Sequence, residues 1–179
     1  MKLATLSVLL GLGISIPGVY GLMKPAEFGA AMRRFPRSLP WGYALMVLAT
    51  AWFVWNLKQE NIADFAPLKP PMMIGFAALG ISACVFLRDF LAVRGLAIVM
   101  LLLAQFVLDV QRWHESGWKN VIALLAYLWV VAGMWFTISP WRMRDIINWK
   151  TATEQRVRIS SAARLALGIL LVVLGLTVF

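Results

Sequence analysis

Long apolar runs separated by short charged segments dominate the pattern of this chain. A helix needs about 20 mostly apolar residues to cross the roughly 30 Å hydrocarbon core of a bilayer. The pattern predicts six such helices, approximately at residues 3–22, 41–57, 72–87, 95–110, 121–139 and 164–179. We therefore expect an all-α integral membrane protein with residues 1–179 forming a single polytopic membrane domain. The first run also resembles a signal peptide, but we expect it to be retained.

Residues 72–110 form one nearly continuous apolar run, which is broken only by Arg88, Asp89 and Arg94. As a single helix these residues would extend about 58 Å, which is far too long for one crossing. We predict two spanning helices that turn near Arg88 and Asp89. A re-entrant segment is the alternative.

Composition agrees with a membrane location. Hydrophobic residues make up 61% of the chain and charged residues 14%, against about 45–50% and 25% in soluble domains. The net charge of +9 comes from basic residues between apolar runs. Because no continuous basic face lies outside these short loops, we expect no nucleic-acid partner.

Basic residues divide unequally between the two sides of the six-helix arrangement, with twelve on one side and five on the other. The larger group is Lys24, Arg33, Arg34, Arg37, Arg88, Arg94, Arg142, Arg144, Lys150, Arg156, Arg158 and Arg164. Cytoplasmic loops carry the excess of lysine and arginine. We therefore expect a bacterial inner (cytoplasmic) membrane location with both termini periplasmic.

Two of the cytoplasmic loops are long enough to form helices of their own. One opens at Pro25 and the other at Pro140, and proline suits the first helical turn. Both alternate apolar residues with arginines, which predicts short amphipathic interfacial helices. With them, the six spans form three helical hairpins. The candidates for docking of anionic lipid or of a partner are Arg33, Arg34, Arg37, Arg142, Arg144, Arg156 and Arg158.

Polar residues inside the apolar runs are few. Gln105 and Asp109 are four residues apart and so share one face of the predicted helix. Because burying polar groups in a bilayer is costly, this pair is a possible intramembrane site for a proton or a cation. Asp109 can equally be hydrated near the helix end, or paired with Arg112.

A second candidate is the periplasmic cluster Arg112, His114 and Glu115. It is the only place where an enzyme acting on lipid or quinone would find an acid and a base. Asp109, His114 and Glu115 could in principle meet at a divalent metal. A zinc site usually needs three or four closely spaced protein ligands with an oriented second shell, and nothing in this loop enforces that, so we expect no metal. No serine has a histidine and an acid to activate it, so we expect no catalytic residue. The sequence requires no cofactor.

The absence of a reaction centre favours a structural or accessory subunit of a larger integral membrane complex. Such a subunit contributes helix packing and a surface that faces lipid or a cofactor, and its partners are membrane lipids and other integral membrane subunits. The alternative is a small transporter or channel that uses Gln105 and Asp109. A further alternative is a membrane enzyme with a periplasmic site near His114.

Overall fold

The computed structural model describes residues 2–61 and 63–179, and over these residues the chain is entirely helical. The described residues form eight α-helices and two 3-10 helices. In chain order these are α1 (Leu3–Met23), α2 (Pro25–Arg34), η1 (Phe35–Arg37), α3 (Leu39–Gln59), η2 (Ala63–Leu68), α4 (Lys69–Phe86), α5 (Leu91–Arg112), α6 (Lys119–Ile138), α7 (Pro140–Lys150) and α8 (Glu154–Thr177).

Several of these helices are long and apolar enough to cross a membrane. Five meet this condition singly, and a sixth is formed when Pro25–Arg37 and Leu39–Gln59 are taken together across their 65° bend. The predicted spans fall within α1, α3, α4, α5, α6 and α8, to within two residues at the ends. The helical fold class is therefore confirmed.

The long run of residues 72–110 forms two helices, as predicted. Helix α4 ends at Phe86 and α5 begins at Leu91, with the turn between them. Phe90 has a φ of 57°, in the left-handed region that residues other than glycine rarely adopt. A single helix cannot pass through that conformation, so the backbone reverses there.

The last predicted span, residues 164–179, belongs to a longer helix than the apolar run suggests. Helix α8 already starts at Glu154. The hydroxyl of Thr153 accepts a hydrogen bond from the backbone N–H of Arg156 at 3.3 Å and caps the helix there. Basic side chains are good helix formers, so Arg156 and Arg158 belong to the same helix as the apolar segment that follows.

The two predicted loop helices are present. Helix α2 begins at Pro25 and α7 begins at Pro140, the two prolines that marked these loops in the sequence. Helix α2 has Arg33 and Arg34 in its last turn.

Contacts divide the chain into two compact units. Unit 1 comprises the chain up to Arg34 together with Leu103–Val131 and Arg144–Phe179. Unit 2 comprises Phe35–Leu102 and Ala132–Met143. The boundaries fall inside α5, α6 and α7, so each of these helices contributes residues to both units.

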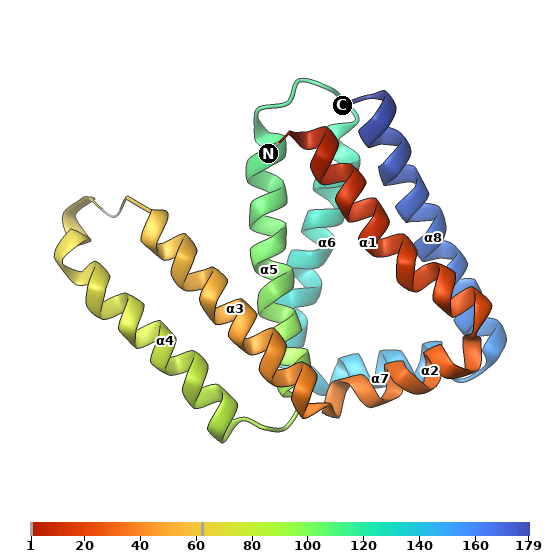
Figure 1. Cartoon of the computed structure of the whole chain (residues 1–179), viewed down its shortest axis with the longest axis horizontal. Helices are drawn as coiled ribbons and strands as arrows, with labels where there is room; N and C mark the ends of the chain where they lie inside the picture. The colour runs from red at the N-terminus through yellow and green to blue at the C-terminus, as the bar shows by residue number, and fades with distance from the viewer. Residues whose placement is uncertain (1, 62) are drawn as a thin grey trace. The chain divides into compact units, whose positions relative to one another are not determined.

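Unit 1 is built around α1 and α8, which run side by side in opposite directions (Figure 1). Their contact uses small residues at every seventh position, namely Ala4, Gly11 and Gly18 in α1 and Ser161, Gly168 and Gly175 in α8. A Cβ atom added to Gly11 would lie 2.6 Å from the carbonyl oxygen of Gly168, and the reverse distance is also 2.6 Å. The two backbones therefore approach as closely as glycine allows.

A buried hydrogen bond joins the same two helices. The hydroxyl of Ser7 donates to the carbonyl oxygen of Leu171 at 2.6 Å. Around it lies the core of unit 1, in which α1 and α8 meet the second half of α5 and the first half of α6 through Leu3, Leu6, Ala104, Val107, Ile122, Leu125, Ala126 and Leu171.

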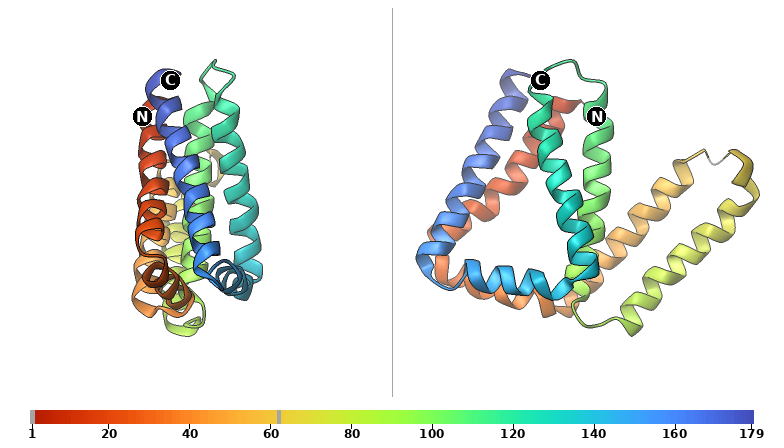
Figure 2. Two further views of the ribbon diagram at one scale, coloured as in Figure 1. Left: turned by 90° about the vertical axis from the view of Figure 1, so that its right-hand side faces the viewer. Right: turned by 180° about the vertical axis from the view of Figure 1, so that it is seen from behind.

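Unit 2 contains the α3–α4 hairpin, whose helices run alongside each other (Figure 2). They meet where Gly80 faces Thr50, and a Cβ atom at Gly80 would overlap the threonine side chain. Gly42 and Gly95 make similar close approaches between α3 and the start of α5. No residue of α4 is buried along its whole described length.

Alanine substitutions in α1 and α8 test the close contact. We expect Gly168→Ala to lower the free energy of unfolding by about 1–3 kcal/mol, because the new methyl group meets backbone that cannot rotate away. Gly13→Ala is the matched control, since no atom lies within 4 Å of a Cβ there. Thermal unfolding in a mild detergent measures both. Equal melting temperatures for the two variants would contradict the packing described here.

Candidate functional site

The two ends of the α1–α8 pair differ in chemistry. One end, called here the terminal end, carries Leu3, Phe179 and the loop around His114. The opposite end, called here the basic end, carries α2, the 144–150 part of α7 and the start of α8. Because α1 and α8 are antiparallel, both chain termini lie at the terminal end (Figure 1).

The structure places Gln105 and Asp109 on an exposed face of α5. Asp109 Oδ1 lies 3.6 Å from Arg112 Nη2, and the two side chains are 57% and 68% exposed. An exposed ion pair of this kind contributes little to stability. From the sequence, Asp109 is either part of a polar intramembrane site or a residue near the helix end that is hydrated or paired with Arg112. The structure shows an exposed ion pair with Arg112 within one helix.

His114 packs within the loop that follows α5. Its Nδ1 accepts a hydrogen bond from the backbone N–H of Ser116 at 3.4 Å, and its ring meets Phe179 edge-on at 5.2 Å. Glu115 is exposed. Within residues 2–61 and 63–179 no group of three histidine, cysteine or acidic side chains is placed to hold a metal ion. The three residues of the predicted periplasmic cluster share this short stretch, but no hydrogen bond, ion pair or ring contact joins them in the described part of the chain.

The basic end contains acidic residues that pair locally. Lys24 Nζ lies 3.1 Å from Glu27 Oε1, and Arg144 Nη2 lies 3.0 Å from Asp145 Oδ1. The hydrogen bond from Lys24 holds the pKa of the Glu27 carboxyl below its ordinary value, and the same bond raises the pKa of Lys24. These carboxylates are thus engaged and do not compensate the cations of the neighbouring cavity.

A cavity of about 470 Å³ opens at the basic end between the last residues of α7 and the first half of α8. Three cations, Lys150, Arg156 and Arg164, line it together with Trp149, and no acidic side chain does. The α8 residues that line it are three or four positions apart and form one helix face, with Ile159, Ala163 and Leu167 supplying the apolar part. Cationic and apolar surfaces therefore meet inside one cavity.

Two of these cations are held over aromatic rings. The guanidinium carbon of Arg156 lies 5.1 Å from the Trp149 ring centroid, and its Nη1 donates to the Trp149 carbonyl at 3.2 Å. Arg164 lies 5.8 Å from the Phe28 ring centroid. Cation–π contacts of this length fix the direction of a guanidinium. Burial, and then the charge of Arg164, lower the pKa of Lys150, so an anion in the cavity would relieve an unfavourable arrangement.

The arginines selected from the sequence lie in different places. Arg156 lines the cavity, whereas Arg158 is exposed on the same helix. Arg33 Nη1 donates to the carbonyl of Thr151 at 3.0 Å and ties α2 to the turn before α8. Arg34 is exposed at the end of α2, and Arg37 and Arg142 belong to unit 2. The structure thus brings only Arg156 of this set into the cavity.

Sequence reasoning treated Lys150 and Arg164 only as indicators of topology. The spacing of Arg156, Ser160, Ala163 and Leu167 shows that they share a helix face, but the sequence holds no signal that Trp149 and Lys150 of the preceding helix fold back beside it. That juxtaposition depends on the turn at residues 151–153.

Comparisons with protein-family models, with curated proteins and with solved structures find no match for this chain. The functional argument therefore rests on the geometry above.

Replacing Asp109 tests whether it belongs to a polar intramembrane site. We expect Asp109→Asn to change the free energy of unfolding by less than about 1 kcal/mol, because the ion pair that it removes is exposed. Thermal unfolding at neutral pH measures the effect, and Arg112→Gln should behave alike. A much larger loss, or a loss confined to Asp109→Asn, would show that the carboxylate has a partner beyond Arg112.

Proposed function

We propose that this protein is a structural subunit of a larger integral membrane complex, with anionic lipid bound at its basic end and without a reaction of its own. The observation that carries the proposal is the exposure of α4. This helix is long and apolar enough to cross a membrane, yet none of the residues in its spanning window is buried.

Exposed apolar side chains cover much of α4, among them Ile74, Phe76, Leu79, Ile81 and Phe86. Lipid tails are as apolar as these side chains, so contact with lipid does little to hold this helix in one fixed position. Packing against a helix of another subunit would hold it. An accessory subunit that offers α4 to a neighbour accounts for this exposure.

The lipid part of the proposal is supported by the basic cavity of Lys150, Arg156 and Arg164. Its cations suit a phosphate, and its apolar face suits the start of an acyl chain. Trp149 is 64% exposed next to it, as is usual for a tryptophan at a membrane interface. On this view the basic end faces the cytoplasm and both termini face the periplasm of a bacterial inner membrane, as the distribution of basic residues predicts.

The structure gives less support to the two alternative functions suggested by the sequence, a transporter and a membrane enzyme. A transporter needs a polar pathway, whereas Gln105 and Asp109 lie on an exposed helix face and do not line the basic cavity. An enzyme near His114 needs groups that act together, and the ring of His114 packs against Phe179.

Gentle extraction of the native protein tests the subunit role. We expect the protein to leave the membrane in a particle much larger than 20.0 kDa, with defined integral membrane partners identified by mass spectrometry. Polar substitutions on the exposed face of α4, such as Ile74→Asn, should release it from that particle. A lone monomer or a simple homo-oligomer would refute the proposal.

Lipid binding is tested with purified protein in neutral detergent. We expect phosphatidylglycerol to raise the melting temperature more than phosphatidylcholine does. The double variant Lys150→Gln/Arg156→Gln should bind phosphatidylglycerol roughly 30-fold more weakly, since each cation contributes about 1 kcal/mol at a membrane surface. Arg158→Gln is the control, because it removes a charge from the same helix outside the cavity. Equal losses in both variants would mean that the effect is one of net charge alone.

A further inference from the structure

Unit 2 contains a cavity of about 330 Å³ that is independent of the basic end. Residues of α3, α4 and α5 line it, with Thr137 of α6 completing the wall, and all of them belong to unit 2. Most of the lining is apolar. Arg94 is the one charged residue among the lining residues.

Arg94 has no anionic partner among the residues that line this cavity. The side chain is half-buried, its Nε is buried without a hydrogen-bond acceptor among the described residues, and no described carboxylate forms an ion pair with it. Burying an N–H group of a charged side chain without an acceptor is costly. Basic residues in spanning helices are candidates for ligand contact for this reason. An anion in the cavity would supply the acceptor that Nε lacks.

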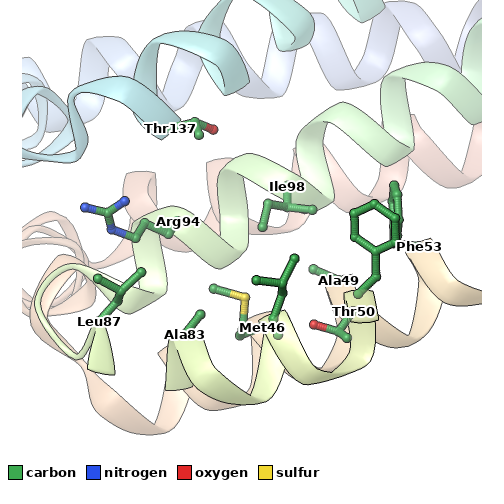
Figure 3. A pocket seen from close by; sticks show the side chains of 12 residues that line it. Met46, Ala49, Thr50, Phe53, Ala83, Leu87, Arg94, Ile98 and Thr137 are labelled. Atoms are coloured by element: carbon green, nitrogen blue, oxygen red, sulfur yellow. The ribbon is translucent and has the colours of Figure 1, made fainter. Parts of the chain in front are cut away.

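Charge and apolar surface occupy different parts of the cavity (Figure 3). Arg94 lies at one end beside Leu87, and Phe53 lies at the other. At that far end the rings of Phe53 and Phe76 meet edge-on with their centroids 4.7 Å apart. A ligand that satisfies both ends has an anionic head and a hydrocarbon chain.

Volume and donor geometry narrow the ligand further. About 330 Å³ is near the lower limit of small-molecule sites, so one hydrocarbon chain fits better than two. The hydroxyl of Thr137 already donates to the carbonyl of Gly133 at 2.8 Å, which leaves the guanidinium to bind the head. A guanidinium pairs with a carboxylate through two parallel hydrogen bonds.

We propose that the cavity of unit 2 binds a single-chain lipid carboxylate, of the long-chain fatty acid class, with its head on Arg94 and its chain directed toward Phe53 and Phe76. This site is separate from the basic cavity of unit 1 and does not depend on a partner subunit, so it stands or fails separately from the proposed function.

Binding of oleate to the purified full-length protein in phosphatidylcholine nanodiscs tests the proposal. We expect saturable binding to the unaltered protein, and a loss of roughly tenfold or more in affinity for Arg94→Gln, because the charge-assisted hydrogen bonds are removed. Arg88→Gln is the matched control. Arg88 is exposed on the turn just before α5 and does not line the cavity, so its variant should bind oleate normally.

Two further variants separate binding from folding. Ala83→Phe keeps Arg94 but fills the cavity, and it should also abolish oleate binding. Without ligand, Arg94→Gln should melt at or above the temperature of the unaltered protein, since it removes a half-buried charge whose Nε has no hydrogen-bond acceptor. Arg94→Lys should retain part of the binding. A fall in the melting temperature of ligand-free Arg94→Gln would indicate a structural arginine and overturn the proposal.

The nature of the head is tested with two other lipids. Oleyl alcohol, which has the same chain without charge, should bind at least tenfold more weakly than oleate. Phosphatidylglycerol, which has two chains and a phosphate, should not displace oleate. Equal binding of the alcohol, displacement by phosphatidylglycerol, or no binding of oleate at all would each overturn the assignment.

Discussion

The close antiparallel contact of α1 with α8 is the interaction on which unit 1 depends. Glycines at every seventh position let the two backbones meet, and the hydrogen bond from Ser7 to the Leu171 carbonyl locks their register. Because the two helices come from opposite ends of the chain, this contact closes the unit. It also places α2 against the start of α8, where Arg33 reaches the carbonyl of Thr151 and Arg164 covers the ring of Phe28.

The distribution of charge at the basic end follows from the contact of α1 with α8. Cations lie together at the basic end, while Glu27 and Asp145 are paired with their own neighbours, Lys24 and Arg144. Lys150, Arg156 and Arg164 therefore face a shared cavity without a counter-charge in its lining. Cations that served only to set the orientation of the protein in the membrane could be spread over a hydrated loop. Cations grouped around a partly apolar cavity and fixed over aromatic rings are instead suited to hold a lipid phosphate.

Unit 2 also contains a basic side chain in a partly apolar cavity whose lining holds no acidic residue. Arg94 lies one turn into α5, where the sequence predicts only a cytoplasmic charge. In the structure the Nε of this side chain is buried, and Arg94 lines a mostly apolar cavity. Both units therefore combine basic groups with apolar walls and no acidic lining residue, and lipid anions are the class of ligand that we propose for both. In the proposed function, the exposed length of α4 contacts a neighbouring subunit.

The sequence by itself determined the class of the protein and the order of its helices. Apolar runs of membrane-spanning length and prolines at 25 and 140 are local signals, because helix formation depends on neighbouring residues. The sequence could not show that α8 begins at Glu154, because the charged residues that follow the Thr153 cap resemble a loop. Nor could it place Lys150 beside Arg164, or show that Arg94 lacks a partner. Those facts depend on contacts between segments distant along the chain, and only the tertiary structure decides which charges remain unpaired.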